Sequence, residues 1–153
     1  MNIRPVTIHD VDAIVRIEKE AFFQPWSKEA FIHEIVDHPF ASLLLMEVEG
    51  KIAGYIGFWL MGDQTQITTL AIKKEFQGRH YGRMLLQRCI ALTKERGYKR
   101  MSLEVNVTNA KAIAIYESLG FVTQALRKGY YLESDGYQDG YLMVKEMEEE
   151  GCL

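Results

Sequence analysis

Residues 77–82 read Gln77-Gly78-Arg79-His80-Tyr81-Gly82, and they stand between an apolar run, Ile67 to Ile72, and an amphipathic run, Met84 to Arg96. This order predicts a strand, a glycine-bearing turn and a helix. The first turn of a helix leaves its backbone N–H groups without intrahelical partners, and the helix dipole places about half a positive charge there. The stretch therefore predicts a cradle for an anion such as a pyrophosphate, and an ordinary turn before a solvated helix is the alternative.

Composition favours one globular domain over residues 1–147, followed by an acidic tail over residues 148–153. The chain of 153 residues is 48% hydrophobic and 25% charged, which is enough for a core of its own. A net charge of −3 and a pI of about 5.8 argue against direct nucleic-acid binding. Cys89 and Cys152 are far apart and have no His at ligand spacing, so we expect neither a disulfide nor a metal site.

The N-terminal segment and the lengths of the apolar runs bear on where in the cell the protein is expected. The chain starts without a basic segment followed by an apolar one, and it has no apolar stretch of roughly 18 residues. We therefore expect a cytoplasmic protein with no membrane contact. The oligomeric state is left open, with a monomer favoured.

The N-terminal half predicts an edge strand, two helices and a three-stranded antiparallel meander. Apolar residues at helical spacing predict a first helix from Val11 that stops near Phe22, because Pro25 disfavours its continuation. A second short helix restarts at Ser27, and the aromatic loop between the two either packs onto the core or faces a substrate. The expected strands are Asn2–Val6, Ala41–Val48, Ile52–Leu60 and Gln64–Ile72.

The C-terminal half predicts a strand, a helix and a final antiparallel pair. Residues 101–107 alternate strictly, which places Glu104 at the centre of a polar strand face. The next helix is capped by Thr108 or Asn109 and runs to Leu119. The last two strands are expected at Phe121–Ala125 and Tyr141–Lys145, joined by a long segment. The order β-α-α-β-β-β-α-β-α-β-β predicts a mixed α/β sheet.

Glu104 and Tyr116 form a candidate reaction centre near the glycine turn. A carboxylate takes up a proton directly or through water, and a phenol with an ordinary pKa of about 10 can give one to a departing thiolate. The pair suits acyl transfer from a thioester to an amine. The alternatives are a surface carboxylate for Glu104 and a core-packing ring for Tyr116.

Several segments carry a family resemblance. Gln77–Gly82 resembles the Q/R-x-x-G-x-G/A motif of the GNAT superfamily of acetyl-CoA-dependent N-acetyltransferases. The segment Leu103-Glu104-Val105-Asn106-Val107-Thr108-Asn109, with Ala112-Ile113 and Tyr116-Glu117-Ser118-Leu119-Gly120-Phe121, resembles the RimI type, which acetylates the N-terminal alanine of a small-subunit ribosomal protein. The resemblance extends to Pro25-Trp26-Ser27, Tyr130-Tyr131 and Asp139, and so covers nearly the whole chain.

The resemblance implies a GNAT-like acyl-CoA N-acyltransferase fold, in which a splayed sheet holds acetyl-CoA between its fourth and fifth strands. It implies that Glu104 is the general base and Tyr116 the general acid, with no metal, and that a ribosomal protein N-terminus is the peptide substrate. The implied cofactor-binding residues are Leu70, Ala71 and Ile72 for the acetyl and pantetheine portions, Gly78, Arg79, His80, Tyr81, Gly82 and Arg83 for the pyrophosphate, and Asn109 for the arm. The expected substrate wall consists of Phe23, Trp26, Tyr130, Tyr131 and Asp139.

The chain departs from the family pattern at two positions. His80 stands where the motif has its middle glycine, so either the turn accepts a Cβ there or the local backbone differs, and His tolerates positive φ better than most residues. Gln138-Asp139-Gly140 stands where the subfamily commonly has Glu-Asp-Ala.

Other functions stay open from the sequence. An acetyltransferase acting on other N-termini, on lysine or on a small amine is the nearest alternative, and a non-catalytic acyl-CoA-binding module is an alternative of another class. A nucleotide-binding domain is disfavoured, because the chain has no Gly-x-x-x-x-Gly-Lys-Ser/Thr.

Overall fold

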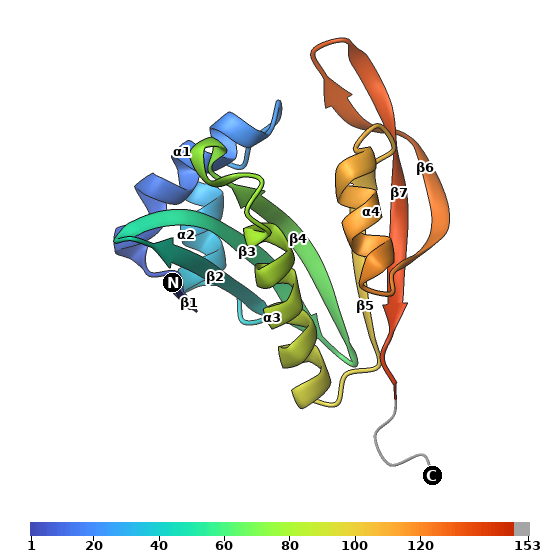
Figure 1. Ribbon diagram of the computed structural model, residues 1–153, viewed down its shortest axis with the longest axis horizontal. Helices are drawn as coiled ribbons and strands as arrows, with labels where there is room; N and C mark the ends of the chain where they lie inside the picture. Colours follow the sequence, from blue (N-terminus) through green and yellow to red (C-terminus); the bar gives the residue numbers. More distant parts are fainter. Residues whose placement is uncertain (149–153) are drawn as a thin grey trace.

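Seven strands form a single sheet in the order β1-β2-β3-β4-β5-β7-β6, as the computed structural model, which describes residues 1–148, shows (Figure 1). All neighbouring strands are antiparallel except β4 and β5, which are parallel. The sheet is therefore mixed, as the sequence predicts. The strands are β1 (Asn2–Pro5), β2 (Ala41–Val48), β3 (Lys51–Met61), β4 (Gln64–Ile72), β5 (Arg100–Asn106), β6 (Val122–Glu133) and β7 (Gly136–Glu146).

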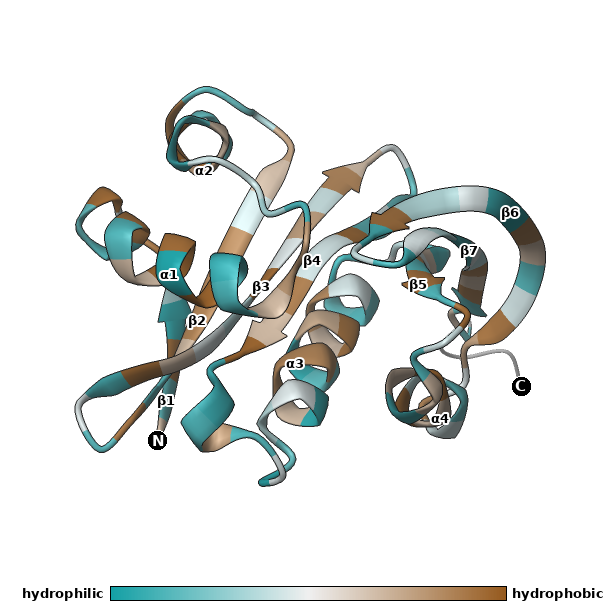
Figure 2. Cartoon of the chain, turned by 90° about the horizontal axis from the view of Figure 1, so that it is seen from above, coloured by the Kyte–Doolittle hydropathy of each residue, from teal (hydrophilic) through white to brown (hydrophobic). Residues whose placement is uncertain are grey.

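Within residues 1–148, four helices cover the two faces of this sheet. Figure 2 shows α1 and α2 on one face and α3 and α4 on the other. The helix α3 makes the crossover between the parallel strands β4 and β5. The helices are α1 (Val11–Ala21), α2 (Lys28–Val36), α3 (Tyr81–Glu95) and α4 (Ala110–Ser118), and two short 3-10 turns lie at Ile8–Asp10 and Lys74–Phe76.

Each sheet face has its own hydrophobic core. Neighbouring residues of β2 alternate between the two, because successive side chains of a strand point to opposite faces: Leu45 packs with α1 and α2, whereas Met46 packs with α3. The core under α1 and α2 centres on Ile14, Phe31 and Tyr55, which are fully buried. The larger core under α3 and α4 contains Leu85, Leu86, Met101, Leu103, Phe121 and Met143.

The order of helices and strands agrees with the sequence prediction, but the last two strands were predicted too short. Instead of short strands joined by a long segment, β6 and β7 form a long hairpin with a tight turn between Glu133 and Gly136. Most of β6 is exposed at the sheet edge, so its residues lack the apolar alternation that marks a half-buried strand. Register shifts at residues 123–125 and 127–131 further break the pattern.

Gly54 of β3 leaves no room for a side chain beside β4. A Cβ at this position would collide with the Ile72 side chain and would lie 2.6 Å from the backbone oxygen of Ala71. Because backbone cannot rotate away as a side chain can, we expect Gly54→Ala to lower the free energy of unfolding by about 1 to 3 kcal/mol. Urea unfolding followed by circular dichroism measures this change.

Gly82→Ala is the matched control for Gly54→Ala. A Cβ at Gly82 would lie 3.5 Å from Ile72 Cγ1, which is ordinary van der Waals contact, and Gly82 belongs to α3. Alanine should therefore be neutral or stabilising there by up to about 1 kcal/mol. Equal losses of stability in both variants would contradict the assignment of the effect to the β3–β4 contact.

The structure also bears on the cysteines, on membrane spans and on metal ligands. Cys89 is buried, and burial raises the pKa of its thiol to about 12. Within residues 1–148, no helix is long and apolar enough to cross a membrane, and no cluster of three potential metal ligands occurs. Cys152 and the acidic tail beyond Glu148 lie outside the described residues.

Candidate active site

A cleft opens in the sheet where β4 and β5 separate. The two strands pair only at Gln64 with Arg100, Thr65 with Met101, and Gln66 with Ser102, and beyond this point they diverge (Figure 1). The space between them belongs to a cavity of about 870 Å³. From Ile67 onward, the edge of β4 that faces β5 has no strand partner, so its backbone groups are available to a ligand.

A bulge lies at the point where β4 leaves its partner. Gly57 of β3 pairs with Thr69 and Phe58 pairs with Ile67, so Thr68 is the extra residue. A bulge of this kind bends a strand and redirects its backbone groups. Here it lies next to Leu70, which lines the cleft as the sequence analysis expects for a cofactor-binding residue.

Aromatic side chains form two opposite walls of the cleft. Phe23 and Trp26 come from the loop between α1 and α2, and Tyr130 and Tyr131 come from β6. Phe23 is 54% exposed, whereas the Trp26 ring contacts Phe31 of the core at 5.3 Å between centroids. The loop is thus packed onto the core through Trp26 and still lines the cleft, which combines the two alternatives that the sequence left open.

Glu104 lies in β5 and lines the cleft, with 16% of its side chain exposed. Both of its carboxylate oxygens accept hydrogen bonds from Nε of Arg127, at 3.0 and 3.1 Å. This ion pair fixes the orientation of the carboxylate. Arg127 was not predicted from the sequence, because it belongs to β6, which β7 separates from the strand of Glu104.

Tyr116 lines the same cleft from α4 and packs edge-to-face against Phe121. Its hydroxyl has no hydrogen-bond partner among residues 1–148. Every fully buried polar side-chain atom in that range has a partner, so the hydroxyl is not fully buried and is accessible from the cleft that Tyr116 lines. Burial raises the pKa of Tyr116 to about 12. The hydroxyl therefore remains a proton donor over the whole physiological range.

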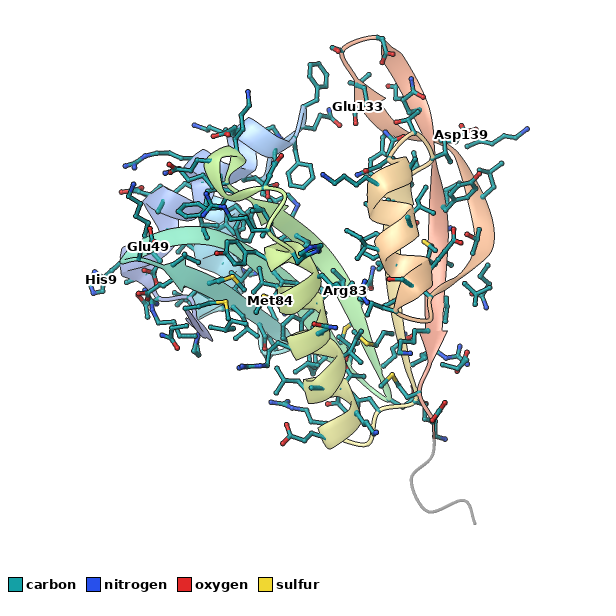
Figure 3. All side chains as sticks on the ribbon, in the orientation of Figure 1. His9, Glu49, Arg83, Met84, Glu133 and Asp139 are labelled. Carbon is teal, nitrogen blue, oxygen red and sulfur yellow. The ribbon has the colours of Figure 1, made fainter. Side chains whose placement is uncertain are left out.

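The glycine turn before α3 contains two residues in the left-handed region. Gly78 has φ of +82°, and His80 is the N-cap of α3 with φ of +64° in the left-handed region. The structure thus confirms that the turn accepts a Cβ at His80. Arg83 reaches from the first turn of α3 to α4, where its Nη1 donates to Ser118 Oγ at 2.7 Å (Figure 3). Arg79 lies over the ring of Phe76, and Tyr81 contacts the same ring.

The left-handed conformation of His80 predicts an unusual stabilising substitution. A residue with a Cβ in this region costs about 1 to 2 kcal/mol, and glycine avoids the cost, although it loses more entropy on folding. We expect His80→Gly to raise the free energy of unfolding by about 0.5 to 1 kcal/mol, measured by urea unfolding.

The reciprocal substitution is Gly78→Ala. Nothing lies within 4 Å of a Cβ at Gly78, so only backbone strain opposes alanine there, and stability should fall. A change of the same sign in both variants would contradict the strain argument.

The side chains of four other residues of the expected site pack in the core or bond to backbone N–H groups. Asn109 lines the cleft, but its side-chain oxygen accepts from Ala112 N at 3.2 Å and so caps α4. Ala71 packs in the core under α1 and α2, and Ile72 packs against the core under α3, so only their backbone can face a ligand. Asp139 does not line the cavity, and its carboxylate accepts from Gly129 N at 2.8 Å, which holds the irregular part of β6 (Figure 3).

Glu18 is a cleft residue that the sequence analysis missed. It lies in α1 and is only 2% exposed. Its carboxylate accepts hydrogen bonds from the Tyr55 hydroxyl, from Thr69 Oγ1 and from the backbone N–H of Trp26. The sequence signal that could have identified Glu18 is its place directly beside the apolar stripe of a helix. A carboxylate that is buried at such a place requires hydrogen-bond donors.

Comparison with known proteins shows relatives over almost the whole chain. A protein of Escherichia coli (strain K12), a ribosomal protein bS18-alanine N-acetyltransferase, is 33% identical over 135 residues, which is 88% of this chain and 90% of the relative. A protein of Bacillus subtilis (strain 168), to which the same name is given provisionally, is 38% identical over 141 residues. The match covers 92% of this chain and 92% of the relative.

The solved structures agree with the sequence relatives. The crystal structure of the ribosomal-protein-S18-alanine N-acetyltransferase from Escherichia coli matches with a TM-score of 0.90 and 30% identity, over 99% of this chain and 98% of that one. The fold is therefore the GNAT fold that the resemblance implied. The model of the acetyltransferase (GNAT) family matches residues 11–121, from α1 to the end of α4. The chain belongs to the GNAT family of acetyltransferases.

Proposed function

We propose that this protein transfers the acetyl group of acetyl-CoA to the α-amine of the N-terminal alanine of ribosomal protein bS18. The observation that carries the proposal is the convergence of Glu104 and Tyr116 in one cleft, at the place where β4 and β5 separate. The names of the relatives support the substrate. A single catalytic domain over residues 1–147, acting as a monomer in the cytoplasm where ribosomal proteins are made, completes the proposal.

The residues around the cleft suit acetyl-CoA. The unpaired edge of β4 offers backbone groups of Leu70, Ala71 and Ile72 to an extended pantetheine chain, and an N–H there would polarise the thioester carbonyl. The free N–H groups of the first turn of α3, with Gly78 to Arg83, suit a pyrophosphate. Asn109 at the start of α4 lines the same cleft as Leu70. When bound, acetyl-CoA supplies the activated acetyl group.

Glu104 and Tyr116 have complementary proton-transfer roles in this proposal. Glu104 takes the proton from the substrate ammonium, directly or through water, so that the free amine can attack the thioester carbon. Tyr116 gives its proton to the departing sulfur of CoA. Arg127 holds the Glu104 carboxylate in place through its two hydrogen bonds. The C–N bond forms as the C–S bond breaks, and no metal is needed for these steps.

The lining of the cleft suits an amine at the end of an extended peptide. Phe23 and Trp26 on one side, and Tyr130 and Tyr131 on the other, form walls for an extended chain. Side chains of Glu18, Glu104, Glu133 and Asp135 also line the cleft, and within residues 1–148 no Lys, Arg or His does. A negative lining favours a substrate that arrives as an ammonium ion.

We expect kcat/KM to rise with increasing pH and then to reach a plateau. A peptide α-amine has a pKa of about 8 and attacks only as the free base, so kcat/KM should increase through pH 8. Tyr116 must stay protonated to act as the acid, and burial raises its pKa to about 12. We therefore expect a plateau up to about pH 10, above which the fold itself is at risk. Initial rates between pH 6 and 10 test this, and a decline that begins near pH 9 would contradict the role of Tyr116.

The substrate is tested with a synthetic peptide that carries the N-terminal residues of bS18. Release of CoA is followed with a thiol reagent, and mass spectrometry locates the acetyl group. We expect turnover with the free N-terminus and none with the same peptide after chemical acetylation of that amine. Turnover on a lysine of the blocked peptide, or only on a small amine, would contradict the substrate. Binding of CoA without turnover on any amine would indicate the non-catalytic module instead.

A further inference from the structure

We propose that Glu18 is a positioning residue for the peptide substrate, because its buried carboxylate ties the loop between α1 and α2 to the strands at the base of the cleft. This inference rests on the proposed function, since it assumes that the loop, residues 22–26, forms a wall for the peptide. Glu18 is not expected to exchange a proton with the substrate.

Glu18 connects three parts of the chain that are far apart in sequence. The Tyr55 hydroxyl of β3 and Thr69 Oγ1 of β4 both donate to its Oε1, the latter at 3.0 Å. The backbone N–H of Trp26 donates to its Oε2 at 3.0 Å. A carboxylate is a pure acceptor with two oxygens, so it satisfies all three donors at once. The α1 helix, the loop and both strands are thus held by one side chain.

The hydrogen bond from the Trp26 N–H to Glu18, called the tether below, is the main backbone contact of the loop. Among the described residues, the backbone of residues 23–26 makes a single hydrogen bond, and its partner is Glu18. Phe22 and Phe23 are 39% and 54% exposed, so packing of their rings adds little constraint. The loop therefore owes its backbone position to Glu18 and to the contact of the Trp26 ring with Phe31.

The other end of the network lies where the reaction takes place. Thr69 follows the bulge residue Thr68 and precedes Leu70, and all three line the cleft with Glu18. Tyr55 is fully buried, and burial beside Glu18 raises the pKa of its hydroxyl far above the usual range, so the hydroxyl remains a donor. Glu18 thereby fixes the distance between the peptide wall and the strand that holds the acetyl group.

Glu18→Gln tests the inference with little change in volume. The amide has only one acceptor oxygen, so it cannot serve the Trp26 N–H and both hydroxyls as the carboxylate does. We expect KM for the bS18 peptide to rise about tenfold or more, because a hydrogen bond to a charged group is lost at the wall. The kcat at saturating peptide and KM for acetyl-CoA should change less than about threefold, because Glu104, Tyr116 and the turn at Gly78 are untouched.

Glu34→Gln is the matched control. Glu34 is also a helical carboxylate, 9% exposed, and it also accepts from a tryptophan N–H, Nε1 of Trp59 at 2.9 Å. It lines a different cavity, bounded by Pro5, Leu44 and Arg96, and not the cleft. This variant should lose thermal stability as Glu18→Gln does, but its peptide KM should equal that of the wild type.

Amide hydrogen exchange gives a second measurement that needs no substrate. Exchange of the Trp26 amide, read by mass spectrometry on loop peptides, should be at least about tenfold faster in Glu18→Gln and unchanged in Glu34→Gln. Should Glu18→Gln fail to fold, Tyr55→Phe takes its place, because it removes one donor and leaves the Trp26 tether. That variant should raise the peptide KM and the Trp26 exchange rate by a smaller factor.

The outcomes separate this inference from the proposed function. Absence of peptide turnover by the wild type would contradict the proposed function, whatever the variants do. With an active wild type, equal peptide KM values in Glu18→Gln and Glu34→Gln, or unchanged Trp26 exchange in Glu18→Gln, would overturn the positioning role. A fall in kcat at unchanged peptide KM would also overturn it, because that pattern belongs to a residue acting in the chemical step.

Discussion

Glu104→Gln is expected to lower kcat/KM for the bS18 peptide by about 10²- to 10⁴-fold, which is the usual contribution of a general base. The amide has nearly the same size and still accepts a hydrogen bond from Arg127, but it cannot take up the proton of the attacking amine. Because the pair of Glu104 and Arg127 is part-exposed, with 45% of the Arg127 side chain accessible, its loss should change stability by less than about 1 kcal/mol. Stopped assays of CoA release and thermal unfolding measure both quantities.

A variant of a second carboxylate in the same cleft separates base catalysis from charge. Glu133 lines the cleft, and its one side-chain hydrogen bond within residues 1–148 is a long one from Asn106 Nδ2, at 3.4 Å. Glu133→Gln removes the same charge from the same cavity, so any electrostatic effect on the incoming ammonium should appear in KM. Similar losses of kcat in both variants would show that Glu104 acts through the field of the cleft and not as the base.

Tyr116→Phe is expected to lower kcat by about a hundredfold or more, with acetyl-CoA affinity nearly unchanged. The ring keeps its contact with Phe121, and the lost hydroxyl has no partner among residues 1–148, so the fold loses no hydrogen bond. What disappears is the proton for the departing thiolate. Steady-state kinetics, combined with calorimetric titration of CoA, distinguish this loss in the chemical step from a loss of binding.

Tyr141→Phe controls for the general effect of deleting a phenol. Tyr141 lies on β7, packs against the larger core and does not line the cleft. Its kcat should equal that of the wild type. Unchanged turnover in Tyr116→Phe would remove Tyr116 from the acid role and direct attention to water as the proton source for the thiolate.

The candidate reaction centre could be predicted from the sequence because its signals are local. Alternation over residues 101–107 placed Glu104 on a polar strand face, and helical spacing placed Tyr116 after it. The glycine turn was recognised for the same reason, since a strand, a turn and a helix follow one another within 30 residues. The conformation of His80 agrees with the expectation that histidine tolerates positive φ.

The contacts that orient these residues could not be found in this way. Arg127 meets Glu104 across 23 positions of sequence, on a strand whose exposed edge leaves no apolar alternation. The bond from Gly129 N to Asp139 was not predicted either, because it depends on the irregular backbone of β6, whose N–H groups need partners. Glu18 has partners 8, 37 and 51 residues away, and its local sequence says only that it adjoins an apolar helix face.

The sequence by itself determined the order of the helices and strands, the position of the glycine turn that we propose as the anion cradle, and the identity of the two residues that we propose for proton transfer. All of these depend on periodicity, turn chemistry and the nature of single side chains, which act over a few residues. Only the tertiary structure decided that β4 and β5 pair over three residues and then diverge, that Glu18 lines the cleft, and that Arg127 meets Glu104. These features depend on strand register and on partners distant in the chain. The contacts that stabilise them form only when the sheet brings those partners together.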